Sequence, residues 1–428
     1  MKLNKKILVL VMAAALPCFS THAQSAAELQ KEMEVLKAQL KMLSEKIEAM
    51  AAKPAAVDPQ EFNRLVQKID LAEEDSIKAG FKGMKFKGVL DVGYSNDEIS
   101  ATTGFDKARG NGGFGAAMFE ISKEPDEGIG WVLRLTPTAG LPIDVANNKV
   151  TGSLVHEASI SVPIGSGSTK IIAGLTPDYS GYELSWGNAN PLISNNLLYT
   201  HSAATNYMGA GLSYAMGPWT AKWMVGQVDG VATRKAPGVA YRADYSASEY
   251  TGVGFSGVHM RTNDGPGDTD LMEVDAYHTR GDLTLQGQFS LGRLIGKAGD
   301  NSGTDARWWG LSGLVGYKMT PRLQAVVRAD YIDNRANGGG MYYTGAGASA
   351  ATIFGAELPA EGDAADPSRG TTRYAVTTGV NYAVNANTQW KTELRFDQSS
   401  GYNFLSSDAE PVRKKGNTTI GTALVVSF

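Results

Sequence analysis

The stretch Thr419-Ile420-Gly421-Thr422-Ala423-Leu424-Val425-Val426-Ser427-Phe428 ends the chain and decides its fold class. Successive side chains of a β-strand point to opposite faces, so every second residue shares a face. One face of this stretch is apolar and carries Ile420, Leu424, Val426 and Phe428. The other face is small or polar. The pattern predicts a strand with one apolar face, as found in the closing strand of a membrane β-barrel or in the last strand of a soluble β-sandwich.

The same two-residue period recurs upstream, from residue 84 onward. Each segment has about the 9–11 residues that a tilted membrane strand needs. The sixteen segments lie near 84–94, 113–123, 129–136, 154–163, 169–175, 206–215, 219–225, 238–247, 250–260, 271–280, 283–291, 306–318, 323–331, 371–383, 389–396 and 416–428.

The connections between these segments alternate between short and long. Tight turns such as Gly217-Pro218 and Gly281-Asp282 alternate with longer stretches near 95–112, 138–153, 176–205, 230–237, 261–270, 294–305, 333–370 and 398–415. Membrane β-barrels sort their connections in this way and have an even number of strands, whereas a soluble sandwich has no reason to. We therefore predict an all-β fold, a 16-stranded antiparallel transmembrane β-barrel over 84–428, with the short turns in the periplasm.

Composition agrees with a membrane barrel. Glycine makes up 50 of the 428 residues, and the mean hydropathy is slightly negative at −0.20, because only alternate residues of each strand face lipid. No run after the amino terminus is long and apolar enough for a transmembrane helix. Without the three lysines of the amino-terminal leader, 37 basic residues stand against 44 acidic ones, a difference of −7, which argues against nucleic acid as a partner.

Residues 1–23 have the pattern of a secretory signal peptide. Lys2, Lys5 and Lys6 precede the apolar run 7–16, and a small-residue cleavage motif ends at Ala23. Removal of this segment also removes Cys18, the one cysteine of the chain. The mature chain then has neither a disulfide nor a thiol nucleophile.

Residues 24–53 predict a periplasmic coiled coil. Apolar residues recur at spacings of three and four: Ala26, Leu29, Met33, Leu36, Leu40, Leu43, Ile47 and Met50. Such a seam is covered by a partner helix in a coiled coil, although a single amphipathic helix lying on its own domain would show it too. Residues 54–83 are expected to form a linker and a second short helix.

Two further stretches carry a family resemblance. Thr169-Lys170-Ile171-Ile172-Ala173-Gly174-Leu175-Thr176-Pro177-Asp178-Tyr179-Ser180-Gly181-Tyr182-Glu183 and the later 190–199 resemble the strand and loop of bacterial outer-membrane porins with an amino-terminal periplasmic coiled coil, the DcaP-like and related proteobacterial porins. The resemblance implies a homotrimer in outer-membrane lipid, passive diffusion of small hydrophilic solutes including ions, and Phe428 as the assembly signal.

In the porins that the chain resembles, the third outer loop folds inward and narrows the channel. Residues 176–205 form the third long connection here. The resemblance therefore implies that a polar constriction is formed by Asp178, Tyr179, Tyr182, Glu183, Trp186, Asn195 and Asn196. An exposed loop or an intersubunit latch is the alternative, and 333–370 is a longer stretch that could enter the lumen instead.

Closure of the barrel places every second strand residue in its interior. Basic residues recur at these positions, so we predict a pore lined by Lys85, Lys87, Arg134, Lys222, Arg242, Arg328, Lys391 and Arg395. Charges of this kind set ion preference in pores. Inward-facing aspartates and glutamates could pair with them, so the sequence leaves only a mild expected preference for anions.

We expect neither an enzyme nor a cofactor or metal site. The nearest catalytic pair, Ser256 and His259, lies three residues apart and thus on opposite faces of one strand. The alternative to a pore is a structural anchor, in which the coiled coil contacts peptidoglycan or another periplasmic partner. A row of lumen arginines and lysines favours the pore, because an anchor has no need of it.

Overall fold

The computed structural model describes residues 83–97, 103–104, 116–123, 128–136, 143–144, 149–150, 155–165, 168–204, 206–228, 237–260, 268–295, 304–336, 356–357, 366–402, 404–405 and 413–428. The predicted signal peptide, coiled coil and second helix lie outside these residues. Gly83–Phe428 forms one compact unit, and all that follows concerns it.

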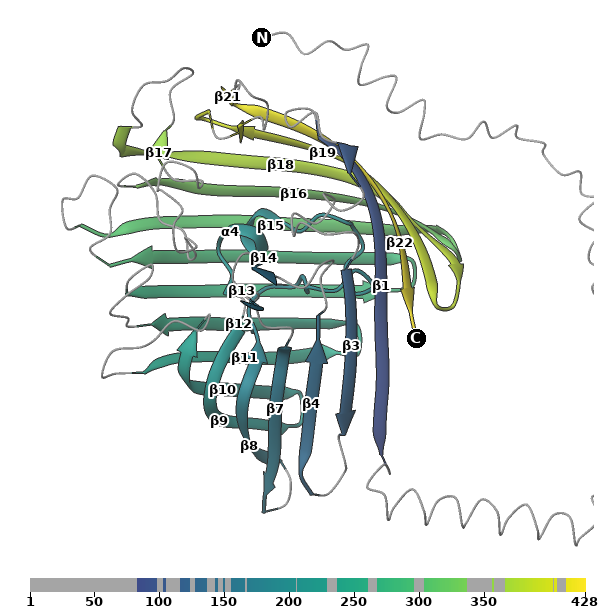
Figure 1. Ribbon diagram of the computed structural model, residues 1–428, viewed down its shortest axis with the longest axis vertical. Helices are drawn as coiled ribbons and strands as arrows, with labels where there is room; N and C mark the ends of the chain where they lie inside the picture. Colours follow the sequence, from purple (N-terminus) through teal and green to yellow (C-terminus); the bar gives the residue numbers. More distant parts are fainter. Residues whose placement is uncertain are drawn as a thin grey trace, which may run out of the picture. The chain divides into compact units, whose positions relative to one another are not determined.

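Sixteen strands close into one antiparallel barrel, as the sequence predicted (Figure 1). Closure occurs where β22 (Gly416–Ser427) pairs with β1 (Met84–Asp97), with Leu90 opposite Val426. The other strands are β3 (Ala116–Lys123), β4 (Gly130–Leu135), β7 (Val155–Ile164), β8 (Thr169–Pro177), β9 (Asn206–Met216), β10 (Trp219–Val228), β11 (Gly238–Ser248), β12 (Thr251–Met260), β13 (Thr269–Arg280), β14 (Leu283–Leu294), β15 (Ala306–Thr320), β16 (Leu323–Ala336), β18 (Asp366–Asn385) and β19 (Thr388–Ser399).

Several hairpins extend beyond the expected strand ends. The connection predicted at 333–370 is shortened to 337–365, because β16 pairs with β15 as far as Ala336 and β18 pairs with β17 from Asp366. Short strands extend the long-loop rim: β2 (Thr103–Gly104), β5 (Ile143–Asp144), β6 (Lys149–Val150), β17 (Ala356–Glu357), β20 (Phe404–Leu405) and β21 (Arg413–Lys414). Pairing satisfies backbone groups that a loop would leave to solvent.

Apolar side chains cover the outside of the barrel. Exposed examples from strands around the circumference are Leu90, Trp223, Phe255, Leu311, Val327 and Phe396. The residues between them point inward and are mostly polar, as Asp91 and Ser95 are on β1. An apolar exterior around a polar interior is the arrangement that a membrane barrel requires. No helix among the described residues is long and apolar enough to span a membrane.

The chain end is fixed by its backbone. Phe428 exchanges two hydrogen bonds with Gly88 of β1, at 2.8 and 3.0 Å. Its ring faces outward, 59% exposed, and lies 6.2 Å from the ring of Phe119. A Cβ at position 88 would collide with the Phe428 ring, so glycine leaves room for the ring to lie over β1.

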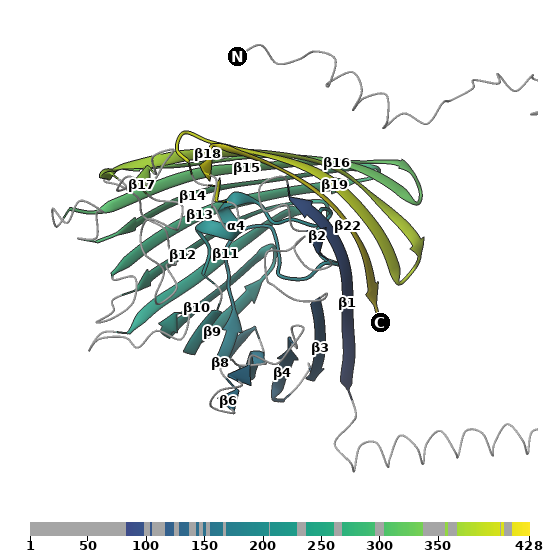
Figure 2. The ribbon, with the colours of Figure 1, turned by 45° about the horizontal axis from the view of Figure 1, so that its top comes forward.

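The connection between β8 and β9 folds across the barrel interior (Figure 2). It includes the short helix α4 (Leu197–His201), whose first turn is capped by Asn196. Leu197 and Leu198 are fully buried in a cluster with Ile332 and other inward-facing residues. This segment, residues 178–204, is called the inner segment below.

Candidate functional site

The inner segment begins at a polar junction with the β9–β11 wall. The Asp178 carboxylate accepts hydrogen bonds from the Ser180 amide, at 3.1 Å, and from the Tyr207 hydroxyl. Burial raises the pKa of Asp178, and these hydrogen bonds oppose the shift. Tyr179 packs edge-on against Tyr207 with ring centroids 4.7 Å apart, and its carbonyl accepts a 2.8 Å bond from Arg242 Nη1.

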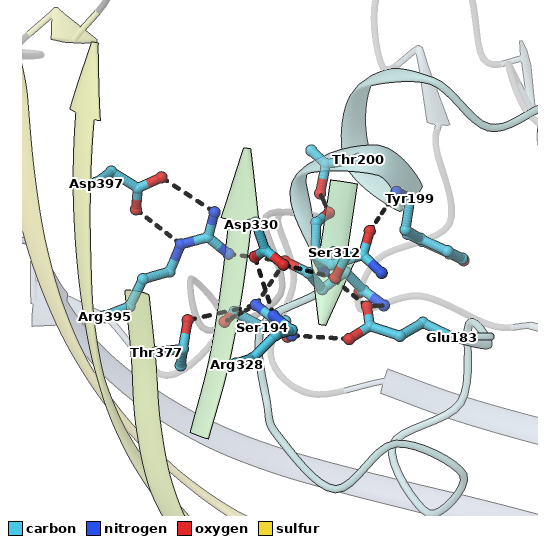
Figure 3. A network of polar contacts seen from close by, with 12 residues as sticks. Glu183, Ser194, Tyr199, Thr200, Ser312, Arg328, Asp330, Thr377, Arg395 and Asp397 are labelled. Carbon is cyan, nitrogen blue, oxygen red and sulfur yellow. Dashed lines mark hydrogen bonds and ion pairs between the residues drawn. The ribbon is translucent and has the colours of Figure 1, made fainter. Parts of the chain in front are cut away.

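Arg328 of β16 holds two parts of the inner segment at once (Figure 3). Its Nη1 atom donates to Glu183 Oε1 at 2.7 Å and to the Ser194 carbonyl at 2.6 Å, while Nη2 donates to the Asn195 carbonyl at 3.0 Å. Its Nε atom donates to Asp330 Oδ2 at 3.0 Å. The side chain is 0% exposed. A planar guanidinium suits this role because its donors point in fixed, different directions.

Glu183 lies at the centre of this network. Besides Arg328, its Oε2 atom accepts bonds from the Asn196 amide at 2.6 Å and from Asn195 Nδ2 at 3.1 Å. Asn196 in turn caps α4, since its Oδ1 atom accepts from the Tyr199 amide at 2.6 Å. Next to the network, the Tyr182 hydroxyl lies 2.6 Å from Ser312 Oγ.

Alternate residues of β19 bind residues 187–195 of the inner segment, which are called the second limb below. Lys391 Nζ donates to the carbonyls of Gly187, at 2.5 Å, and Asn190. Glu393 accepts from the amides of Ile193 and Ser194 at 2.7 and 3.0 Å. Arg395 Nη1 donates to the Asn195 carbonyl at 2.7 Å, and its Nε donates to Asp397 at 2.7 Å. One strand face therefore supplies both donors and acceptors to the segment.

Trp186 extends from the inner segment to the wall formed by β22, β1 and β3, next to β19. It packs against Val89, Met118 and Val425. Its ring centroid lies 4.9 Å from that of His156 and 5.5 Å from the Arg134 guanidinium carbon. The register of β4 and β7 shifts between Arg134 and Leu135. Such an irregularity redirects a side chain, which accounts for His156 reaching Trp186 although its neighbour Glu157 also faces inward.

Charges on the β1–β7 wall are paired. Arg134 binds Glu120 and Glu157, both at 2.5 Å, and Lys87 binds Glu120 at 3.1 Å. Lys85 lies two residues before Lys87, on the same face of β1. Further round the barrel, Arg242 pairs with Asp275 and Asp244, both at 2.7 Å.

All eight predicted lumen cations lie on inward-facing strand positions, but three of them do not meet an open lumen. The inner segment covers Arg328, Lys391 and Arg395, whose exposures are 0, 1 and 9%. The sequence left open that inward-facing carboxylates pair with these cations; the inner segment adds carbonyl and carboxylate partners that the strand pattern does not locate. Glu393 was predicted only as an inward-facing carboxylate that could pair with lumen cations, not as a contact of the inner segment, and His156 was not among the predicted site residues. The unbroken run of charge on β19, at 391, 393, 395 and 397, was the available signal for Glu393.

Ser256 and His259, the nearest catalytic pair in the sequence, lie on opposite faces of β12. Ser256 is buried and inward-facing, whereas His259 lies on the outer face, 2.9 Å from Asp270. A hollow of about 670 Å³ adjoins His259, Arg293 and Trp309 and also the buried Trp308 and Asp333. Among the described residues, no three His, Cys, Asp or Glu side chains are grouped as metal ligands would be.

The chain belongs to a family of outer-membrane porins. The profile of the family described as "Putative beta-barrel porin-2, OmpL-like" matches residues 83–428, which is the whole barrel. The barrel is therefore an outer-membrane channel protein. A comparison with curated proteins found no match.

Solved structures support the same fold. Outer-membrane-expressed OmpT of Vibrio cholerae is 11% identical with a TM-score of 0.51, covering 81% of this chain and 97% of that one. The outer membrane channel DcaP of Acinetobacter baumannii is 10% identical with a TM-score of 0.50 and the same coverage. At these identities the likeness concerns the fold.

Proposed function

We propose that the barrel is a passive diffusion channel for small hydrophilic solutes, mildly preferring anions, in which the inner segment sets the narrowest passage. The observation that carries the proposal is the anchoring of the inner segment by Arg328 and by the inward face of β19. A polar segment held across a barrel narrows the interior, and the charges at its edge act strongly on ions there because little water screens them.

Conductance measurements test this function. The purified full chain, inserted into a planar bilayer, should give stepwise currents proportional to voltage, and liposomes that contain it should swell in small sugars but not in large oligosaccharides. Deletion of 183–190, which removes Glu183 and Trp186, should raise the single-channel conductance. A barrel that inserts but carries no current and admits no sugar would contradict the proposal and leave the anchor function.

The assembly is also a proposal. We infer a homotrimer embedded in outer-membrane lipid, with the periplasmic coiled coil of 24–53 joining its copies or contacting peptidoglycan. The unbroken apolar seam of that segment supports this inference. Leu36→Asp with Leu43→Asp should dissociate the segment, because a charge in a desolvated core is costly. Analytical ultracentrifugation of a 24–78 peptide would contradict the coiled coil if the peptide stayed monomeric at high concentration.

A further inference from the structure

Two rows of side chains cross the outer face of the neighbouring strands β12 to β15, at the long-loop end of the barrel (Figure 1). Within each row, every residue lies directly opposite the next one in the strand register, and such residues share a face of the sheet. Leu291, a member of the second row, is 47% exposed, so this face belongs to the apolar exterior. The polar row is His259, Asp270, Arg293 and Arg307, and the apolar row, two residues nearer the middle of β13, β14 and β15, is Met272, Leu291 and Trp309.

The hollow of about 670 Å³ lies against both rows. Every residue of the polar row and of the apolar row lines it, together with Gly292, Trp308 and Asp333. The register of β15 and β16 shifts between Arg307 and Trp309, and an irregularity of this kind bends the strand and interrupts its pairing. The size of the hollow falls within the range of about 300–1,000 Å³ that small-molecule sites occupy.

The two arginines of the polar row are directly opposed, and like charges in such positions destabilise a sheet. Asp305 Oδ2 lies 3.7 Å from Arg293 Nη1 and 3.5 Å from Arg307 Nη2, which is too far for a strong hydrogen bond to either. Asp270 is bound by Arg293 at 2.7 Å and lies 2.9 Å from His259 Nδ1, while the Arg307 side chain is 65% exposed. A phosphate between the two guanidinium groups would relieve their repulsion and match their planar sets of donors.

The rest of the lining suits a lipid better than a free anion. The apolar row leads from the arginines toward the middle of the membrane, where acyl chains lie, and an indole ring such as that of Trp309 is favoured at the boundary between headgroups and chains. Asp333 also lines the hollow, with its Oδ2 atom 3.4 Å from the Tyr331 hydroxyl. A carboxylate beside the arginines would repel a bare phosphate, but it can accept a hydrogen bond from a sugar hydroxyl.

We propose that this hollow binds a phosphorylated glycolipid of the outer leaflet. A phosphate of the lipid lies between Arg293 and Arg307, its sugar lies beside Asp333, and an acyl chain follows the apolar row. The long loops are taken to lie outside the cell, as the alternation of short and long connections predicts. The site is on the outer face of the barrel and does not depend on conduction through the lumen.

Native mass spectrometry of the full-length protein in detergent measures the binding. Diphosphoryl lipid A, titrated into the wild type, should bind in a saturable way. Arg307→Gln should weaken this binding about tenfold, as the loss of one charge-assisted hydrogen bond does, and Trp309→Ala should weaken it to a smaller extent. The matched control is Arg280→Gln, which removes an arginine of the same face from the opposite end of β13 and should bind lipid A as the wild type does.

Two comparison lipids test the two parts of the headgroup. Digalactosyl diacylglycerol has sugars and acyl chains without phosphate, and phosphatidylglycerol has phosphate and acyl chains without a sugar. Each should bind at least tenfold more weakly than lipid A. Binding of either one as tight as that of lipid A would overturn the proposal.

The variants can also contradict the site. Wild-type affinity for lipid A in both Arg307→Gln and Arg293→Gln would overturn it. Should Arg293→Gln fail to fold, the exposed Arg307 still provides the test. If Arg307→Gln changed the number of chains in the assembly, the hollow would be a contact between copies of the chain, and the proposal would be wrong. Tight, Arg307-dependent binding of lipid A by a protein that carries no current would contradict the channel function and leave the lipid site standing.

Discussion

The β16–β19 wall and the β8–β11 wall carry the same kinds of charged side chain in different surroundings. On the first wall, Arg328 and Lys391 are covered by the inner segment and satisfied by its carbonyls and carboxylates. On the second, Lys222 borders a recess, and its ammonium lies over the ring of Tyr179 in the inner segment. Inward-facing charge is therefore not one structural class. Arg328 and Lys391 hold the inner segment by hydrogen bonds, whereas Lys222 contacts it through an aromatic ring and lines a recess.

Loss of Arg328 should have the largest effect on the covered wall. Arg328→Met leaves Glu183 and Asp330 buried without their cation, and breaking a buried pair in this way costs about 3–5 kcal/mol. The inner segment should detach, and a glutamate-specific protease should cut after Glu183 in the inserted barrel. In the control Arg307→Gln, at an arginine whose side chain is 65% exposed, the peptide bond after Glu183 should stay uncut. Resistance of Arg328→Met to cleavage would contradict the anchoring role.

Loss of the Glu393 carboxylate should have a smaller effect than loss of Arg328, because Glu393 binds only the second limb of the inner segment. Glu393→Gln weakens two bonds from the amides of Ile193 and Ser194, and the expected cost is about 1–3 kcal/mol. Hydrogen exchange of the 190–197 peptide should speed up by tenfold or more, with little change at α4. Glu249→Gln, in an exposed turn, is the control. If the 190–197 peptide exchanged at the wild-type rate in Glu393→Gln, the prediction would fail, and Lys391 and Arg395 would be the residues that fix the second limb.

Trp186 marks the boundary between the covered wall and the rest of the lumen. Trp186→Ala removes an aromatic and a cation–π contact worth about 1–2 kcal/mol together and widens the space beside Arg134. Single-channel conductance should rise, by less than in Arg328→Met, and Trp186→Phe should fall between wild type and Trp186→Ala. A conductance unchanged in both variants would place the narrowest point elsewhere.

Strand number and connection order could be predicted from sequence, because lipid outside and water inside impose a period of two. The closing strand, with its outward Leu424, Val426 and Phe428, is one such case. Strand ends were less predictable, since β16 and β18 keep pairing past the apolar band. Pairing there depends on the partner strand and not on a residue pattern.

The site was predictable in position but not in detail. Loop order pointed to 176–205, and Glu183 and Asn196 do lie among inward-facing residues. Which cations the segment covers could not be read, because Arg328 and Lys222 occupy equivalent inward positions on strands far apart in sequence. The alignment of Lys170, Lys222 and Arg242 on one wall was equally hidden, since strand register brings Lys170 and Arg242 into one line across 72 residues of chain.

The most direct test of this account compares two lumen lysines: Lys391, which donates hydrogen bonds to the inner segment, and Lys222, which lines the recess. Reversal potentials of single channels in a potassium chloride gradient should be measured for Lys222→Gln and Lys391→Gln. Removal of the recess-lining charge should shift the reversal potential toward cation selectivity by several millivolts or more, whereas removal of the hydrogen-bonded charge should leave the sign and size of selectivity close to wild type even if conductance rises. An equal shift in both variants, or a shift in Lys391→Gln alone, would contradict the division between segment-anchoring and recess-lining charge.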